Sequence, residues 1–238
     1  MTDEAQARRQ NEGNRVRQPG DRAVKPRDAA TLFIIRRDGP KPRVLMGKRH
    51  GGHDFMPNLW VFPGGRIDKS DFQAPYATDL RPEVAGKFEA HITLRKARAL
   101  GLAAIRETFE EAGLMLGKRV EPRPVAGPWR DFLAHGASAD LSALSIVYRA
   151  VTPPTLAKRY DTWFLMADAE HLVSLDREPD CGELEEIAWF EFEEAKELKL
   201  PMVTRSVITE VMSRLDQPEN RPIPYMRFRQ GPTKPREL

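Results

Sequence analysis

The stretch AAIRETFEEAGLML, residues 103–116, decides how the rest of the chain is interpreted. Its apolar residues recur at helical spacing, while Glu107, Glu110 and Glu111 stand at positions i, i+3 and i+4. Because successive helical residues are about 100° apart, the three glutamates project from one face. Like charges at this spacing destabilise a helix by about 0.2–0.5 kcal/mol per pair, and no lysine or arginine follows in the next turn. Such a face either stays solvated or binds a hard divalent cation such as Mg²⁺, which prefers oxygen ligands.

The composition is that of a globular protein with a high charge load, since the 238 residues are 40% hydrophobic and 31% charged. No run of about 18 apolar residues predicts a transmembrane helix, and the arginines near the start precede no apolar segment. The single cysteine, Cys181, excludes an internal disulfide. We therefore expect a cytoplasmic protein with no membrane association.

Basic charge is concentrated at the two ends of the chain. Residues 1–28 carry a net charge of +2 and residues 217–238 one of +3, which leaves −2 on residues 29–216. A nucleic-acid-binding domain more often carries basic residues on its folded face, so we expect no nucleic-acid partner. We expect one domain over 29–216, a disordered tail at 1–28 that is poor in apolar residues, and an irregular basic tail at 217–238.

Alternating apolar segments and turn residues predict the elements of this domain. Two strands flank the turn DGPKP and form a β-hairpin, and helices follow Pro82 and Glu193. The expected strands are 31–37, 43–50, 59–62, 144–152, 161–169 and 186–192, and the expected long helices are 93–112 and 201–215. Strands and helices alternate without a strict repeat, which favours an α/β fold with a mixed sheet covered by helices.

A second conspicuous stretch, WVFPGGRIDKSD at 60–71, contains a proline and two glycines that let the backbone approach a ligand closely. Gly65, five residues, Asp71, a gap and then RETFEEAGL at 106–114 resemble the Nudix box. That box reads G, five residues, E, seven residues, then R-E-aliphatic-x-E-E-x-G-aliphatic. The resemblance implies a Nudix-type α/β/α sandwich in a single domain, and a metal-dependent diphosphatase.

The chain departs from the box in three ways. Asp71 stands where glutamate is usual, and Thr108 stands where an aliphatic residue is usual. The gap of seven residues has become 34, which corresponds to an insertion at about 72–98. Because it enters between the loop and the helix, we expect the insertion to leave the helix intact and to add a cap near the substrate.

The long insertion is similar to one branch of the superfamily, that of the mammalian peroxisomal coenzyme A diphosphatase. The chain shares with it AAIRETFEE at 103–111, KRYDTWFLMA at 158–167 and GELEEIAWF at 182–190. In the last stretch, Glu183 matches a fourth carboxylate that some members bring from a distant loop as ligand or base, although two neighbouring glutamates compete for this role.

The resemblance also assigns roles within the box. Glu107, Glu110 and Glu111 would hold Mg²⁺ or Mn²⁺, with the carbonyl of Gly65 as a further ligand. Glu107 or Glu110 would orient or deprotonate a water molecule. Arg106 would tie the helix to the loop by charge-assisted hydrogen bonds. Nudix domains often pair, so a homodimer is compatible with the resemblance.

Four residues outside the box are candidates for contact with substrate. His53 and Phe55 lie in the loop before FPGG, which should face the substrate, although a hydrated loop is the simpler interpretation of the histidine. Arg49 and Arg159 could meet phosphate groups, or could form ordinary surface ion pairs.

Three classes of function remain open on this reading. The first is hydrolysis of a diphosphate in a small nucleotide-type substrate such as coenzyme A or acyl-coenzyme A, with ADP-ribose, a dinucleotide or a nucleotide sugar as alternatives. The second is a Nudix-fold sensor that binds a nucleotide without cleaving it, although such modules commonly lose box carboxylates that this chain keeps. The third, weaker than both, is binding of RNA or an RNA cap through the basic tails.

Overall fold

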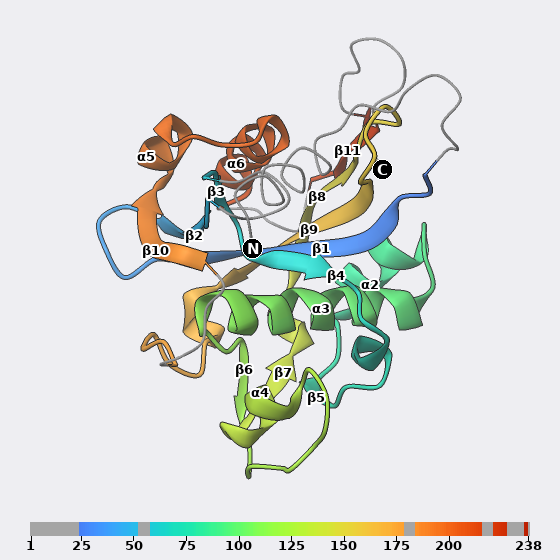
Figure 1. The fold of residues 1–238 in the computed structure, drawn as a ribbon, viewed down its shortest axis with the longest axis vertical. Helices are drawn as coiled ribbons and strands as arrows, with labels where there is room; N and C mark the ends of the chain where they lie inside the picture. Colours follow the sequence, from blue (N-terminus) through green and yellow to red (C-terminus); the bar gives the residue numbers. More distant parts are fainter. Residues whose placement is uncertain (1–23, 52–57, 179–183, 216–220, 228–235, 238) are drawn as a thin grey trace, which may run out of the picture.

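A computed structural model of the chain describes residues 24–51, 58–178, 184–215, 221–227 and 236–237. Within these residues the main element is a mixed nine-stranded sheet with the order β10-β2-β1-β9-β8-β11-β12, in which β3 pairs with β2 and β4 with β1 (Figure 1). Its strands are β1 (Arg27–Arg36), β2 (Arg43–Arg49), β3 (Trp60–Val61), β4 (Gly64–Arg66), β8 (Ser145–Val151), β9 (Tyr160–Asp168), β10 (Leu184–Glu191), β11 (Pro224–Arg227) and β12 (Arg236–Glu237).

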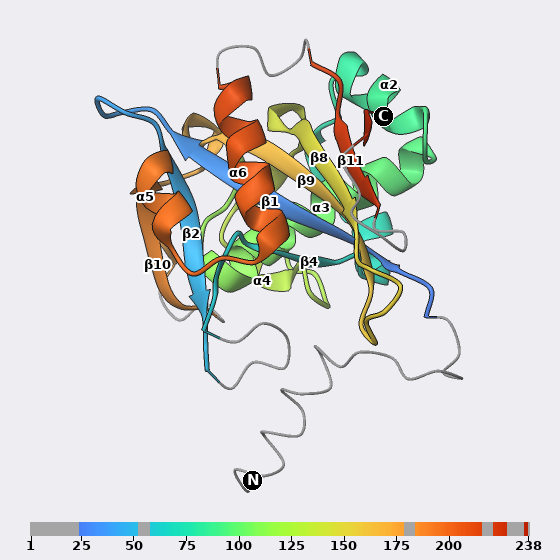
Figure 2. The same ribbon diagram turned by 90° about the horizontal axis from the view of Figure 1, so that it is seen from above.

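The central strand β1 is buried on both faces, because it lies between two layers of helices. It pairs with β9 in parallel and with β2 and β4 antiparallel, so the predicted hairpin and mixed sheet are confirmed. Leu32 and Ile34 join the core beneath α3 (Leu94–Ala112), whereas Phe33 and Ile35 join the core beneath α6 (Met202–Arg214). With α5 (Phe192–Glu197) beside α6, the helices form the outer layers of a three-layer α/β/α sandwich (Figures 1 and 2).

Helix α3 carries the box carboxylates, and its ends are fixed by local sequence. The hydroxyl of Thr93 accepts a hydrogen bond from the backbone N–H of Lys96 at 3.3 Å and caps the first turn. The last turn ends at Gly113 with φ of 68°, a left-handed conformation that glycine adopts at little cost. The apolar face, including Leu102 and Phe109, is buried as expected, so the predicted helix is confirmed.

The insertion forms structure on the α3 side of the sheet. It contains β5 (Tyr76–Thr78) and α2 (Pro82–Glu89), and it follows the 3₁₀ turn η1 (Lys69–Phe72). Phe88 of α2 packs on Trp163 of β9, with ring centroids 4.8 Å apart. Strand β5 joins a small sheet of order β5-β7-β6, with β6 at Gly117–Arg119 and β7 at Ala137–Asp140. The short elements α4 (Arg130–Ala134), η2 (Leu141–Ala143) and η3 (Ala169–His171) complete this side (Figure 1).

The expectation of an irregular C-terminal tail is wrong for residues 224–227, which form β11. This strand pairs in parallel with β8, and the side chain of Met226 is buried against the α6 side of the sheet. The buried guanidinium of Arg214 at the end of α6 donates to the carbonyl oxygens of Arg221 and Pro222, which fixes the approach to the strand. At the other end, β1 begins at Arg27, slightly inside the segment that we expected to be disordered; residues 1–23 lie outside the described residues.

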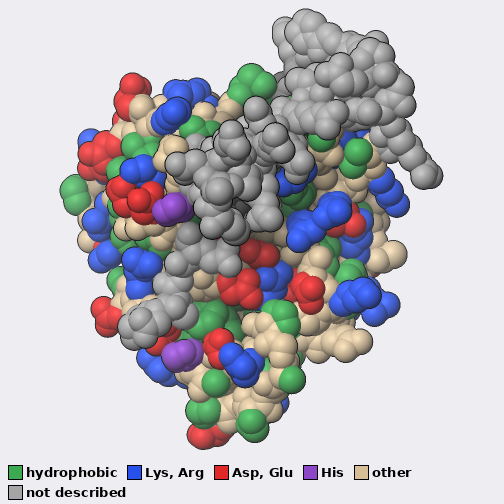
Figure 3. Space-filling view, in the orientation of Figure 1, with side chains coloured by type: hydrophobic (Ala, Val, Ile, Leu, Met, Phe, Trp, Pro, Cys, Tyr) green, Lys and Arg blue, Asp and Glu red, His purple; other side chains and the backbone are tan. Residues whose placement is uncertain are grey.

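No helix among the described residues combines the length and the apolar character that crossing a bilayer would require. The face shown in Figure 3 carries acidic and basic side chains interspersed, without one continuous basic surface among its described residues.

Candidate metal and diphosphate site

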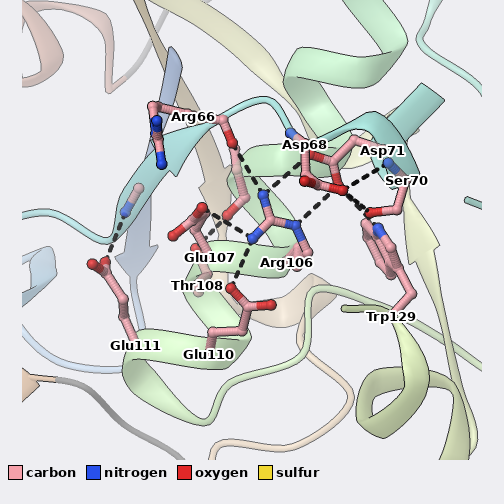
Figure 4. A network of polar contacts seen from close by, with 12 residues as sticks. Arg66, Asp68, Ser70, Asp71, Arg106, Glu107, Thr108, Glu110, Glu111 and Trp129 are labelled. Atoms are coloured by element: carbon pink, nitrogen blue, oxygen red, sulfur yellow. Dashed lines mark hydrogen bonds and ion pairs between the residues drawn. The ribbon is translucent and has the colours of Figure 1, made fainter. Parts of the chain in front are cut away.

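The box helix meets the Gly-Gly strand at the edge of the sandwich. Strand β4 pairs with β1 through Gly64 and Gly65, and α3 packs directly beneath it (Figures 1 and 4). This packing brings Glu107 next to Gly65 and Glu111 next to Gly64, although the segments are more than forty residues apart in the sequence. The two halves of the predicted box therefore meet in space despite the insertion between them.

Arg106 is the link between the helix and the loop. Its nearly buried guanidinium donates from Nε to Oδ1 of Asp71 at 3.0 Å and from Nη2 to Oδ2 at 3.1 Å. Nη2 also donates to the carbonyl of Arg66 at 3.1 Å. This forked contact matches the geometry of a carboxylate, so one side chain fixes the helix to both η1 and β4.

The same guanidinium also offsets the charge repulsion between the glutamates on this face of α3. Its Nη1 donates to Oε1 of Glu107 at 2.9 Å and to Oε2 of Glu110 at 2.7 Å (Figure 4). Burial by itself would lower the pKa of Arg106, but the hydrogen bonds to Asp71 and the charges of Glu107, Asp71 and Glu110 outweigh it and raise that pKa. Arg106 therefore stays cationic and offsets the repulsion between Glu107 and Glu110. The compensating charge comes from the helical turn before Glu110, not from the turn after it.

Glu111 is held separately from the other two glutamates. Its Oε2 accepts a hydrogen bond from the backbone N–H of Gly64 at 2.9 Å, and the residue is only 6% exposed. In Figure 4 this carboxylate points toward β4, away from the cluster around Arg106. The box thus presents two carboxylates on a cationic support and one carboxylate bound to the backbone of the glycine loop.

Trp129 belongs to this network, although nothing in the sequence pattern indicated it. Its indole Nε1–H donates to Oδ1 of Asp71 at 2.9 Å. The residue directly precedes α4, about sixty positions after Asp71, so the pairing follows from the tertiary fold alone.

The residues of the box fit a divalent metal ion by type and by space. The available ligands are carboxylate and carbonyl oxygens, which Mg²⁺ and Mn²⁺ prefer. A Cβ atom at Gly65 would lie 2.3 Å from Oε1 of Glu107, so only glycine leaves room for that carboxylate beside the backbone. Among the described residues, no three His, Cys, Asp or Glu side chains already converge as a metal cluster, because Glu107 and Glu110 face Arg106 while Glu111 faces Gly64.

A cavity of about 280 Å³ lies on the α6 side of the sheet, and none of the three box glutamates lines it. Gly64 lines this cavity and also donates its N–H to Glu111, so the two features share a wall. Most of the other lining residues are apolar, among them Val61, Phe62, Val151, Leu156, Phe164 and Val203. The polar lining residues include Thr152, Thr162 and Arg49. The cavity can therefore enclose a largely apolar group.

The remaining predicted residues fall into three groups. Arg49 lines the cavity, and its contact with substrate stays a prediction. Arg159 does not line it; its guanidinium donates to the carbonyl oxygens of Thr152 and Val24 and joins two chain segments. His53, Phe55 and Glu183 lie outside the described residues. The insertion, which packs on the α3 side, contributes none of the residues that line this cavity, so the expected cap is not formed over it by the described residues.

Comparison with known proteins agrees with this geometry. No family model matches the chain. Among curated proteins, the acyl-coenzyme A diphosphatase NUDT19 of Gallus gallus is 31% identical over 134 residues, which cover 43% of this chain and 35% of the relative. The putative nudix hydrolase 7 of Caenorhabditis elegans is 38% identical over 76 residues, covering 32% of this chain and 18% of that protein. The matched stretches thus span about a third or less of these relatives.

A solved structure provides the broader match. The NUDIX hydrolase from Alicyclobacillus acidocaldarius superimposes with a TM-score of 0.58 at 27% sequence identity, over 80% of this chain and 92% of that one. The predicted fold class is therefore confirmed. In its box, its fold and these similarities the chain resembles the Nudix hydrolases, and among them the acyl-coenzyme A diphosphatases.

Proposed function

We propose that the protein hydrolyses a diphosphate linkage in a nucleoside diphosphate-linked substrate, with Mg²⁺ or Mn²⁺ as cofactor. The observation that carries the proposal is the arrangement of the box carboxylates. Two of them rest on Arg106, which a buried aspartate holds, and the third is bound at the glycine loop beside an apolar cavity. This arrangement suits a charged diphosphate with an organic group on one side.

Glu107, Glu110 and Glu111 would hold the metal, and the carbonyl of Gly65 would complete the protein ligands. A divalent ion bound there supplies neutralising charge for the phosphates and lowers the pKa of a coordinated water. The residues of the chain supply position. Arg106 keeps the carboxylates in place through contacts of 2.7–2.9 Å, and Glu107 or Glu110 accepts the proton of the attacking water.

The reaction needs no covalent nucleophile from the protein. Water attacks one phosphorus, the bond from that phosphorus to the bridging oxygen breaks, and the bridging oxygen leaves with the other phosphate. Arg49, in the wall of the cavity, would meet a phosphate oxygen on the side of the organic group. The catalytic contribution of the chain is therefore charge and orientation.

Acyl-coenzyme A or coenzyme A is the substrate class that we favour. The curated relative that matches the chain over 134 residues bears the name acyl-coenzyme A diphosphatase. The mainly apolar lining of the cavity suits the chain that is attached to the diphosphate in such a molecule. ADP-ribose, dinucleotides and nucleotide sugars are the alternatives within the same reaction. The cytoplasmic location, the homodimer and the role of Glu183 stay predictions.

A substrate panel tests the proposal. The full-length protein is incubated with Mg²⁺ or Mn²⁺ and coenzyme A, acyl-coenzyme A, ADP-ribose, NADH or diadenosine polyphosphates, and the products are identified by mass. We expect coenzyme A to give 3′,5′-ADP and phosphopantetheine. The Glu110→Gln protein should lose at least about 100-fold in kcat, as for loss of a general base. Tight binding of one compound without any cleavage would instead favour a sensor.

A further inference from the structure

We propose that Trp129 is a positioning residue of this site, acting through Asp71 and Arg106 on the carboxylates of Glu107 and Glu110. The inference rests on the proposed function, because it concerns the carboxylates that would hold the metal. Trp129 lies outside the box, and among the described residues its indole donates a hydrogen bond to Asp71 and to none of the three glutamates. Its influence passes through a continuous chain of hydrogen bonds (Figure 4).

The carboxylate of Asp71 is fully buried, and each of its oxygens receives two donors. Oδ1 accepts from Nε of Arg106 at 3.0 Å and from Nε1 of Trp129 at 2.9 Å. Oδ2 accepts from Nη2 of Arg106 at 3.1 Å and from the backbone N–H of Asp68 at 2.7 Å. The indole and the Asp68 amide thus hold the carboxylate from the sides that Arg106 does not occupy. Without the indole, Oδ1 would have Arg106 as its one remaining donor among these contacts.

The orientation of the guanidinium depends on that carboxylate. Nε and Nη2 of Arg106 both donate to Asp71, and Nη2 donates in addition to the carbonyl of Arg66. Nη1 donates to Glu107 and Glu110. Because the guanidinium is planar and rigid, a rotation of Asp71 about its side chain turns Nη1 as well. Any loosening at Asp71 therefore displaces the support of two carboxylates at once.

Packing keeps the indole in place for this task. The ring of Trp129 packs edge-on against Phe132 with centroids 5.2 Å apart, and Phe132 packs edge-on against Phe109 of α3 with centroids 5.5 Å apart. Phe109 lies between the box glutamates in sequence but on the buried face of the helix. The region that follows the box helix in sequence thus returns to fix the loop of the box from outside. Aspartate is one methylene shorter than the usual glutamate, and here an additional donor reaches it.

The decisive variant is Trp129→Phe in the full-length protein, which removes the N–H and keeps most of the ring. The matched control is Phe88→Leu, which disturbs a buried aromatic pair on the same side of the sheet, that of Phe88 with Trp163, and leaves the contacts of Asp71 unchanged. Mn²⁺ is titrated into each protein without substrate, and free Mn²⁺ is measured by electron paramagnetic resonance. We expect Trp129→Phe to weaken Mn²⁺ binding about tenfold, the lower end of the range for loss of an outer hydrogen bond to a metal site. Phe88→Leu should bind Mn²⁺ as the parent does, even where its melting temperature falls further.

A measurement on the unmodified protein covers the case in which a variant does not fold. With ¹⁵N-labelled tryptophan, addition of Mg²⁺ should shift the indole N–H resonance of Trp129 more than those of Trp163 and Trp189. An unchanged Trp129 resonance in a protein that binds Mg²⁺, or equal Mn²⁺ affinity in Trp129→Phe and the parent, would overturn the inference and leave the proposed function standing. A parent protein that binds neither ion would overturn the proposed function, and this inference with it.

Discussion

Replacing Gly65 by alanine separates the needs of the site from the needs of the fold. The new Cβ atom would lie 2.3 Å from Cδ and Oε1 of Glu107, whereas ordinary contacts begin at 3.4 Å. The carboxylate must therefore move by about 1 Å. Because it stands at the end of a flexible side chain, the cost to stability is that of an off-rotamer side chain, about 0.5–1.5 kcal/mol.

The cost to activity should be larger than the cost to stability. The displacement disrupts the 2.9 Å hydrogen bond from Arg106 and moves one expected metal ligand. A misplacement of about 1 Å at a reacting centre costs on the order of 100-fold in rate, or about 2.7 kcal/mol of activation free energy. We therefore expect Gly65→Ala to fold nearly as stably as the parent and to lose about 100-fold in kcat, measured by product formation and by urea unfolding.

Two other glycines provide matched controls. Gly86 in α2 has nothing within 4 Å of a Cβ atom, so Gly86→Ala should raise the free energy of unfolding by about 0.5–1 kcal/mol and leave kcat unchanged. A Cβ atom at Gly64 would lie 2.5 Å from the backbone oxygen of Ala30, which cannot move aside cheaply, so Gly64→Ala should lose about 1–3 kcal/mol or more of stability. Full activity in Gly65→Ala, or a loss of stability equal to that of Gly64→Ala, would refute the reasoning.

Two further predictions concern the stability of regions away from the three box glutamates. Burial by itself would raise the pKa of Asp140, but hydrogen bonds from Ser142, Thr78 and Lys118 lower it to about 2, below the value of 3.8 in the unfolded chain. The stability that Asp140 contributes is therefore present above pH 4 and is lost as the pH falls toward 2. Asp140→Asn should lower the free energy of unfolding by roughly 1–2 kcal/mol at pH 7, and its urea midpoint should approach that of the parent near pH 2. A difference in midpoint that is constant with pH would contradict this. Met226→Ala in β11 should lower the free energy of unfolding by about 2 kcal/mol and leave kcat unchanged, because this side chain is buried in the core on the α6 side of the sheet. An unchanged urea midpoint would show that β11 contributes little to stability.

Local signals in the sequence were sufficient for the box helix. The capping hydroxyl of Thr93, the glycine at 113 and an apolar period of 3.6 act within a few residues of one another, and the helix follows them at both ends. The role of Arg106 could also be inferred, since it depends on the spacing of the box. Its pairing with Glu107 and Glu110 could have been inferred from the i, i+4 spacing as well.

Long-range pairings were beyond the reach of the sequence pattern. Strand β11 was assigned to an irregular tail because prolines surround it, and only the exposed edge of β8 makes those residues a strand. Trp129 likewise has no periodic or motif signal, because its partner Asp71 is brought to it by the fold. The position of the insertion on the α3 side depends on apolar contacts such as Phe88 with Trp163, which no spacing in the chain encodes.

The central claim is that water, activated at the box carboxylates, attacks a phosphorus of the diphosphate. The most direct test is to incubate the protein with acyl-coenzyme A and Mg²⁺ or Mn²⁺ in ¹⁸O-labelled water and to analyse the products by mass spectrometry. The account predicts 3′,5′-ADP and acyl-phosphopantetheine, with one ¹⁸O atom in a phosphate group of one of these products and none in the thioester carbonyl. Both products should be lost in Glu110→Gln. Release of the free acid with ¹⁸O in its carboxylate, and an intact diphosphate, would contradict the account.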